Sequence, residues 1–316
     1  MAVSQKQIAE RVGVSIALVS RVLSGKAREV GIAEATIAKV MKAAEEMGYV
    51  PSAAALTLKG KSSNTIGVVV YDFKDPFFGA MIEELQSQAH GRGYSLVLAG
   101  FQQRIPEAAD LAPLLKHAID GLIILGSEDD SEWMKAFRDI PVVRIGHGRA
   151  EEQTVRMSID EDDAADQLLR YLSGQGLHKL AFIHEHFAAH RVRFQALEKR
   201  AEAYGCSVRR VLSDGWAFEA GRKETEAILA ANGIEAIVCA TDKIAMGALH
   251  AMHDADRRLP VTGFDDIPAA AQFLPPITTI RQPYVEIAAK AFEAAVEPAS
   301  TGMMLFKGEL KVRKSA

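Results

Sequence analysis

The sequence has little of several features that define whole classes of protein. It contains only two cysteines, Cys206 and Cys239, which provide neither a disulfide framework nor the cysteine spacing of a zinc site. Apolar stretches such as 66–70 and 122–125 are far shorter than the roughly 20 residues that a membrane span needs. Polar residues occupy positions 4–7, where a secretory signal would carry its apolar segment. We therefore expect a cytoplasmic protein with no membrane association.

An excess of charge of either sign is also absent from the chain as a whole, but not from its parts. The net charge of 316 residues is −4, whereas residues 1–61 contain nine Lys or Arg and five Asp or Glu, and so carry +4. The remaining 255 residues carry −8. A small basic region attached to a larger acidic one predicts that contact with a polyanion is confined to the first sixty residues.

The first fifty residues show the spacing of three short helices. Ser4 and Gln7 form a capping-box pair, and Gly13 interrupts the apolar pattern before Ser15 offers a second N-cap. A third apolar stripe over 37–47 ends at Gly48 and is stopped by Pro51. Three helices with a tight corner between the first two predict a helix-turn-helix, whose second helix enters the major groove of DNA.

The sequence of this region resembles the lactose/galactose repressor (LacI/GalR) family of bacterial transcriptional regulators. The resemblance rests on three runs, Ile8-Ala9-Glu10-Arg11-Val12-Gly13-Val14-Ser15, Val19-Ser20-Arg21-Val22-Leu23-Ser24-Gly25 and Met47-Gly48-Tyr49-Val50-Pro51-Ser52. Two features depart from the family pattern. Ala33 replaces the usual Ser or Thr cap of the third helix, and the stretch 26–31 is longer than is common in the family. Neither departure touches the second helix.

The resemblance implies which side chains contact operator DNA. Arg21 is expected to read guanine, while Ile16 and Ala17 offer apolar contact, as to a thymine methyl group. Ser15 and Ser20 are expected at phosphates, and Ser4 joins the DNA-contacting set. The alternative for Arg21 is a capping or pairing role within its own helix.

Residues 52–61 form a helix-competent segment that is too short to persist alone. In the resembling family this segment folds on the operator, which by position makes Leu58 a minor-groove wedge and places Ala55 at the contact between two hinge helices. Leu56 stands where an arginine is usual. A plain alanine-rich linker is the alternative.

From residue 62 onward, short apolar runs alternate with helical stretches, which is typical of parallel sheets covered by helices. The runs are 66–70, 96–99, 122–125, 142–145, 180–183 and 236–239. We therefore predict an all-α helix-turn-helix head (1–51), a hinge (52–61) and an α/β module of two parallel-sheet subdomains (62–316). The first subdomain is expected to comprise 62–161 and 281–297, and the second 162–280 and 298–316.

The α/β module also resembles the family, as a periplasmic-binding-protein-like effector module. The similarity is clearest in 66–69 with 75–78, 120–123, 241–249, 263–268 and 275–283. The segment 257–263 is about four residues shorter than the family pattern, which predicts a trimmed strand. By position, the resemblance implies that the effector is a sugar or sugar derivative bound by Phe77, Phe78, His147, Asp160, His190, Arg191, Trp216, Thr241 and Asp265. For the aromatic residues, packing is the alternative, and for Asp265 a structural turn.

Other functions have weaker support in the sequence. His184, His186 and His190 alternate as strand-borne metal ligands would, but a loop of solvated histidines is the favoured interpretation, and we expect no metal and no cofactor. The acidic run 160–163 is typical of a helix start, where the helix dipole favours negative charge. The sequence contains no recognisable nucleophile–base pair or phosphate-binding loop that would indicate an enzyme. We predict a homodimeric repressor of palindromic operator DNA that is controlled by a carbohydrate effector. The alternatives are a stand-alone sugar-binding receptor and, more remotely, a DNA-associated enzyme.

Overall fold

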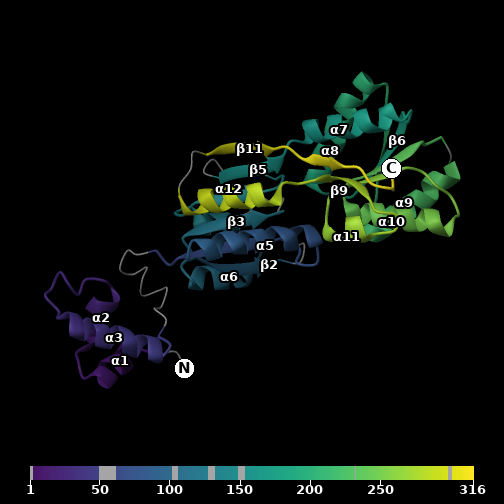
Figure 1. Cartoon of the computed structure of the whole chain (residues 1–316). Helices are drawn as coiled ribbons and strands as arrows, with labels where there is room; N and C mark the ends of the chain where they lie inside the picture. Colours follow the sequence, from purple (N-terminus) through teal and green to yellow (C-terminus); the bar gives the residue numbers. More distant parts are fainter. Residues whose placement is uncertain are drawn as a thin grey trace. The chain divides into compact units, whose positions relative to one another are not determined.

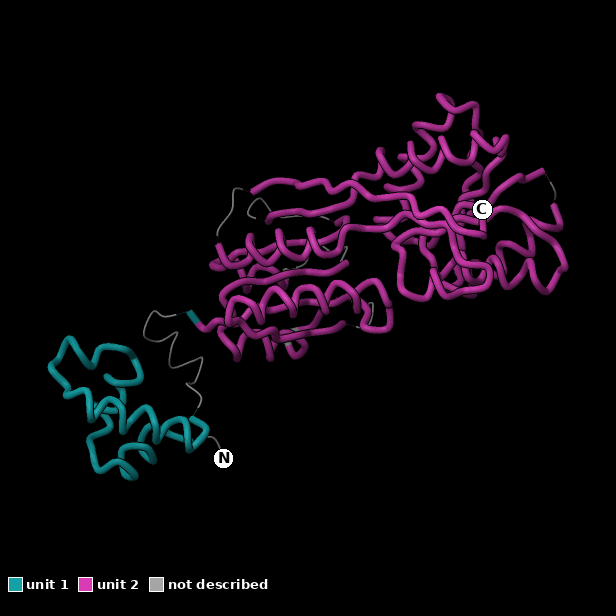
Figure 2. The backbone as a smooth tube through the Cα atoms, viewed as in Figure 1, with its two compact units in different colours: residues 1–62 teal, residues 63–316 magenta. Residues whose placement is uncertain are grey.

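The computed structural model describes residues 3–49, 62–101, 106–126, 132–148, 154–231, 233–297 and 301–316. The chain divides into two compact units, Met1–Ser62 and Ser63–Ala316 (Figure 2). The expected hinge, with Ala55 and Leu58, lies outside the described residues.

The smaller unit contains three helices, α1 (Gln5–Val12), α2 (Ile16–Leu23) and α3 (Glu34–Glu46). Both halves of the predicted capping box are present, because the Gln7 N–H donates to Ser4 Oγ at 3.3 Å and the Ser4 N–H donates to Gln7 Oε1 at 2.8 Å. Gly13 adopts a left-handed conformation with φ 75°, which is accessible to glycine without strain and ends α1. Ser15 then caps α2, so the predicted corner is confirmed.

An apolar core holds these three helices together. One side chain from each helix is completely buried in it, namely Ile8, Val19 and Val40. At the start of α3, Ala33 makes no side-chain cap, as expected from its side chain. The exposed Arg28 Nε donates to Glu34 Oε1 at 2.8 Å in the first turn of α3 instead. The packing of Val40 in the core therefore stabilises α3, although no side chain caps the N-terminus of this helix.

The larger unit contains two six-stranded sheets, which are parallel except where β12 pairs with β10. The order of the first sheet is β11-β5-β4-β3-β1-β2, and that of the second is β12-β10-β9-β8-β6-β7 (Figure 1). The first sheet consists of β1 (Thr65–Val70), β2 (Ser95–Gly100), β3 (Gly121–Leu125), β4 (Val142–Ile145), β5 (Thr154–Ile159) and β11 (Gly302–Phe306). The second consists of β6 (Lys179–His184), β7 (Ser207–Leu212), β8 (Ala236–Cys239), β9 (Val261–Asp265), β10 (Thr278–Arg281) and β12 (Glu309–Lys311).

Helices cover both faces of the sheets, which explains the fully apolar runs in the sequence. Val68 and Val69 are neighbours on β1 but belong to different cores, because successive side chains of a strand point to opposite faces. On the first sheet these helices are α5 (Pro76–Gly91), α12 (Tyr284–Val296), α6 (Ala108–Lys116) and the 3₁₀ helix η1 (Glu132–Phe137). The second sheet lies between α7 (Glu161–Gly174) with α8 (Ala188–Ala201) and α9 (Ala217–Ala231) with α10 (Asp242–Asp254) (Figure 1). The short helices η2 (Glu202–Tyr204) and α11 (Pro268–Gln272) complete the second half.

The chain crosses between the two sheets three times: from β5 to α7, from β10 to α12 and from β11 to β12. One boundary predicted from the sequence was wrong. Residues 298–316 were assigned to the second subdomain, but β11 pairs with β5 over 302–306 and so extends the first sheet. The shortened segment 257–263 does not disturb the second sheet, because β9 forms between β8 and β10 and is buried throughout.

Candidate functional site

The exposed side of α2 carries the residues predicted to read bases. Ile16 is 49% exposed, and Ala17 and Arg21 are exposed with it, while Val19 and Val22 face the core. No hydrogen bond or ion pair involves the Arg21 guanidinium within residues 3–49, so nothing there holds it in the capping or pairing role considered above. The arginine is therefore available to an acceptor outside the protein.

Two of the predicted DNA-contacting serines, Ser4 and Ser15, lie at helix starts and have clear local roles. Ser15 Oγ accepts from the Leu18 N–H at 3.2 Å, and Ser4 Oγ is held in the capping box of α1. Each hydroxyl thus sits beside the first N–H groups of a helix, where the backbone favours anions. Ser20 is partly buried on α2, next to Arg21.

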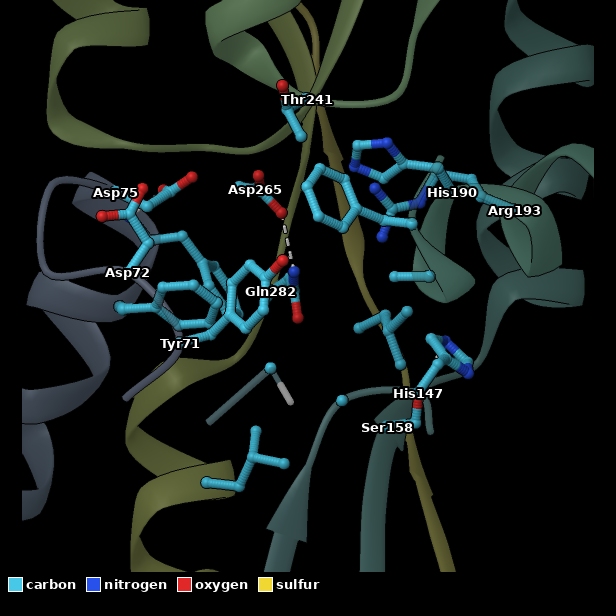
Figure 3. A pocket seen from close by; sticks show the side chains of 18 of the residues that line it. Tyr71, Asp72, Asp75, His147, Ser158, His190, Arg193, Thr241, Asp265 and Gln282 are labelled. Carbon is cyan, nitrogen blue, oxygen red and sulfur yellow. Dashed lines mark hydrogen bonds between the residues drawn. The ribbon is translucent and has the colours of Figure 1, made fainter. Parts of the chain in front are cut away.

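A cavity of about 140 Å³ lies between the two sheets of the larger unit. Its walls come from residues that follow the carboxyl ends of strands, such as Asp72 after β1, His147 after β4, Thr241 after β8 and Gln282 after β10. Ligands of open parallel sheets bind at these ends. Seven of the nine predicted effector residues line this cavity: Phe77, Phe78, His147, His190, Trp216, Thr241 and Asp265. Figure 3 labels His147, His190, Thr241 and Asp265 among them.

The other two predicted effector residues do not line the cavity. Asp160 is the N-cap of α7 and accepts from the Asp163 N–H at 3.0 Å. Arg191 is exposed on α8, and its guanidinium approaches the His186 carbonyl at 3.5 Å. The helix-start interpretation of the acidic run 160–163 is confirmed, because α7 begins there.

The arginine of the cavity is Arg193, which the sequence analysis missed. Its guanidinium donates to Glu161 at 3.0 Å through both Nε and Nη2, and it also donates to the Ala240 carbonyl oxygen. The guanidinium carbon lies 3.2 Å from the centroid of the Phe264 ring. Arg193 is one helical turn beyond His190, which the family resemblance had placed in the effector site, so the i, i+3 spacing on α8 was the available signal.

Glu161 connects this arginine to the first sheet. His147 Nε2 lies 3.3 Å from Glu161 Oε1 and 2.8 Å from Ser158 Oγ. Burial favours the neutral acid, but the Arg193 charge and the hydrogen bonds from His147 and Arg193 keep the pKa of Glu161 below its usual value. Glu161 is therefore a buried carboxylate ion that pairs with Arg193 within the second half of the larger unit and reaches the first sheet through His147.

Asp265 ends β9 with a positive φ of 105°, and its side chain faces the cavity. Its Oδ1 accepts from Gln282 Nε2 at 2.8 Å (Figure 3). Burial raises the pKa of Asp265 well above its usual value. Thr241 serves a different purpose, since its hydroxyl accepts from the Ile244 N–H at 3.3 Å and caps α10.

The interpretation of the histidines as a solvated loop was wrong for two of the three. His184 is fully buried, and its Nε2 accepts from Arg210 Nε at 2.8 Å. His190 is also buried, and its Nδ1 accepts from the Glu185 N–H at 3.3 Å. Burial lowers the pKa of His190 well below its usual value, so the ring lines the cavity as a neutral group. Only His186 is exposed.

Aromatic rings form the remaining walls of the cavity. Phe187 contacts Trp216 edge to face at a centroid distance of 5.4 Å and Tyr71 at 5.9 Å. Because Tyr71 follows β1 and Phe187 follows β6, this contact joins the two halves of the larger unit. Trp216 remains 45% exposed, so part of its ring surface is accessible to a ligand.

Comparisons with known proteins agree with this division of the chain. Residues 5–52 match the family model of bacterial regulatory proteins of the lacI family, and residues 169–315 match that of a periplasmic binding protein-like domain. The HTH-type transcriptional repressor PurR of Vibrio vulnificus is 31% identical over 309 residues, which cover 92% of this chain and 90% of the relative. The chain belongs to the LacI family. It is a DNA-binding transcriptional regulator.

A second relative and two solved structures extend the comparison. PurR of Serratia proteamaculans is 31% identical over 301 residues, covering 91% of this chain and 87% of the relative. The lac repressor dimer bound to operator and the anti-inducer ONPF superposes with a TM-score of 0.84, at 24% identity, covering 100% of this chain and 99% of that one. A CelR–cellobiose complex gives 0.71 at 22% identity, covering 99% and 100%. The PurR relatives are named repressors rather than enzymes. Within the described residues, no helix is long and apolar enough to span a membrane.

Proposed function

We propose that this LacI-family regulator is a cytoplasmic, homodimeric repressor of palindromic operators and that a carbohydrate bound in the cavity changes its operator affinity. The observation that carries the DNA-reading part is the exposed Arg21 on α2, with no partner in residues 3–49. A stand-alone sugar receptor would not need such a helix, and we assign no catalytic role.

On DNA, Arg21 forks onto guanine O6 and N7, and Ile16 and Ala17 contact base edges through apolar groups. Ser4, Ser15 and Ser20 bind phosphates and fix the register of α2 in the groove. One head buries too little surface for high specificity, whereas two heads related by a dimer axis read two half-sites. The proposed operator is therefore palindromic.

The hinge belongs to the proposal through its sequence, since Ala55 and Leu58 lie outside the described residues. Paired hinge segments fold on the operator, with Ala55 at their contact and Leu58 as a wedge between base pairs. A helix of this length is unstable alone, so its folding is coupled to DNA binding.

The carbohydrate part rests on the walls of the cavity. Asp265 supplies a carboxylate for sugar hydroxyls, and Trp216, beside Phe187, supplies an aromatic face. Cellobiose is bound to CelR, and lactose to a LacI-family regulator from Arthrobacter that superposes with a TM-score of 0.69, at 20% identity, covering 79% of this chain and 98% of that one. Both ligands are carbohydrates.

Coupling between the sites follows from the contacts that cross the cavity. His147 and Glu161 join the first sheet to Arg193 of the second, and Lys243 Nζ of α10 lies 4.0 Å from Asp75 Oδ2 at the start of α5. A ligand that binds one arrangement of the two halves better shifts their equilibrium and, through linkage, the operator affinity.

The decisive experiment titrates the full chain with an operator selected from random DNA, at fixed salt. Arg21→Ala should weaken operator binding by about 1–3 kcal/mol and flatten discrimination at one base position. The control is Lys39→Ala, an exposed basic residue of α3, which changes the charge equally. Equal weakening of Arg21→Ala on operator and random DNA would show that Arg21 is a phosphate contact.

A further inference from the structure

The cavity is lined by more acidic side chains than basic ones. Five carboxyl groups line it, while the lining includes two Lys or Arg side chains, Arg193 and Lys243. The carboxylates are Asp72, Asp75, Glu161, Glu185 and Asp265. Figure 3 shows Asp72 and Asp75 on one side of the cavity, opposite His190, Arg193 and His147. An acidic surface thus faces a basic one.

The basic side has little positive charge to offer. The Arg193 guanidinium is neutralised by its two hydrogen bonds to Glu161, and a third goes to the Ala240 carbonyl. His190 is kept neutral by burial. Lys243 is the remaining cation of the lining, 4.0 Å from Asp75 Oδ2. Apart from the Glu161–Arg193 pair, Lys243 is the Lys or Arg of the lining that acts on Asp75 and Glu185.

Two of these carboxylates retain an oxygen without a partner although they are more than nine-tenths buried. Glu185 is 5% exposed, and its Oε1 accepts from the Ala217 N–H at 2.7 Å, which leaves Oε2 without a hydrogen bond in the described chain. Asp265 is 8% exposed, and Oδ2 is likewise without one, since Gln282 binds Oδ1. Neither oxygen is among the described buried side-chain atoms that lack a partner, so both border the open space of the cavity, where a ligand donor can take the place of water.

The charge of Asp75 acts on both Glu185 and Asp265. Burial raises the pKa values of Asp75, Glu185 and Asp265, and the Asp75 charge contributes to the increase at both Glu185 and Asp265. The three side chains come from α5, from the residue after β6 and from the end of β9, so both sheets contribute. A cation placed among them would relieve their mutual repulsion.

A bare metal ion does not suit this arrangement. In the described part of the chain, no group of three or more His, Cys, Asp or Glu is positioned to hold one. Aromatic faces from Tyr71, Phe187 and Trp216 also line the cavity, and they favour an organic cation through the electrostatic attraction of the ring face. A molecule with an ammonium group and hydroxyls satisfies the carboxylates and the rings together.

We propose that the effector is an amino sugar whose ammonium group binds between Glu185 and Asp265, both of which the Asp75 charge also affects. This inference rests on the proposed function, which places a carbohydrate effector in the cavity. The ammonium group donates to Glu185 Oε2 and Asp265 Oδ2, and the sugar ring packs against Trp216.

The test is calorimetric titration of the full chain with matched pairs: D-glucosamine against D-glucose, D-galactosamine against D-galactose, and D-mannosamine against D-mannose. The N-acetyl derivative of each amine retains the size but loses the charge. We expect at least one amine to bind at least tenfold more tightly than both of its neutral counterparts. The same amine should change the affinity for the selected operator.

Glu185→Gln should reduce the preference for that amine over its neutral partner at least tenfold, while keeping an acceptor for the Ala217 N–H. Glu198→Gln, at an exposed position of α8 outside the lining, is the matched control. If Glu185→Gln does not fold, Asp75→Asn serves the same purpose, because asparagine also caps a helix.

The outcomes separate this inference from the proposed function. Neutral sugars that bind as tightly as their amines and alter operator affinity would overturn the amino-sugar assignment and leave a carbohydrate effector in place. If neither amines nor neutral sugars bind or affect operator affinity, both are overturned. An amine preference that survives Glu185→Gln and Asp75→Asn would also contradict the assignment.

Discussion

The two units of the chain place their charges in opposite ways. Among residues 3–49 no polar or charged side chain is buried, and the core of the head is entirely apolar. The larger unit buries Arg144, Glu161, Glu185, Arg193, Asp242 and Asp265. In the head, function requires charges at a surface that meets DNA. In the larger unit, charges line a cavity and must find partners within the protein.

Because of this difference, an Arg–Glu ion pair contributes differently to stability in the two units. The Arg28–Glu34 pair of the head has side chains that are 80% and 68% exposed, whereas those of Arg193 and Glu161 are 7% and 4% exposed. Exposed pairs contribute little to stability because water screens them. Removing one partner of a buried pair leaves an uncompensated charge.

The largest expected effect therefore comes from Glu161→Ala. It should destabilise the larger unit by about 3–5 kcal/mol, because the Arg193 guanidinium is left buried and unpaired. Thermal unfolding of the full chain measures the loss, and Glu34→Ala in the head is the matched control, with no measurable change expected. The double variant Glu161→Met/Arg193→Met should recover most of the stability. If Glu161→Ala and Glu34→Ala lowered the thermal stability equally, the buried and the exposed ion pair would not differ in their contribution.

The next expected effect concerns Asp242, whose burial should lower the stability of the larger unit when its side chain is ionised. It is fully buried at the start of α10, its Oδ2 accepts from the Ile267 N–H at 2.9 Å, and burial raises its pKa from 3.8 to about 7. A carboxyl group with a raised pKa in the folded state binds its proton more tightly there than in the unfolded chain. Stability from this group is thus greatest below pH 4 and is lost as pH rises from about 4 to 7.

Asp242→Asn removes this pH dependence and retains an acceptor for the Ile267 N–H. The variant should gain about 2.5–3 kcal/mol of stability relative to the parent as pH rises from 5 to 8, because most of the change over this range occurs between pH 5 and 7. Chemical denaturation at pH 5, 6, 7 and 8 measures it. A constant difference across that range would show that Asp242 does not titrate there.

Asp265→Asn has a smaller expected effect, and a local one. The amide cannot reproduce both acceptors of the carboxylate toward a ligand, so effector affinity should fall by about 1.5–3 kcal/mol, the value of a hydrogen bond to a charged group. Operator binding without effector should stay nearly unchanged, because the residue lies in the cavity and not in the head. Unchanged effector affinity in a folded variant would remove Asp265 from the binding site.

The contrast between the units also explains what the sequence could predict. In the head, the decisive features are local: Ser4 with Gln7, Gly13 and Ser15 lie within twelve residues and define the corner of α1 and α2 by themselves. In the larger unit, the apolar runs predicted six strands, but β5, β7, β9, β10, β11 and β12 were not among them. β7 lies at a sheet edge with largely exposed residues and so lacks the continuous apolar run.

The cavity was predictable only in part, because its contacts join distant residues. Asp265 and Trp216 could be placed by family position, but the pairing of Glu161 with Arg193 and of Gln282 with Asp265 depends on how the crossings bring the sheets together. The periodicity of β11 does not reveal which sheet it extends. Resemblance identifies positions; the partners of a buried charge follow from tertiary structure.

The smallest expected effect concerns the hinge, residues 52–61. Leu58→Ala should weaken specific operator binding by about 1–2 kcal/mol through lost apolar contact in the groove, and it should reduce DNA bending. Binding to random DNA should barely change, because it depends on phosphate charge. If hinge folding transmits the state of the cavity, the variant should also show a smaller effector-dependent change in operator affinity. The measurement is a titration of an operator with a central pyrimidine–purine step and of random DNA, with and without effector, with Thr57→Ala as the neighbouring control. An operator-to-random ratio equal to that of the parent would favour a plain linker, and communication between head and cavity would then require another route.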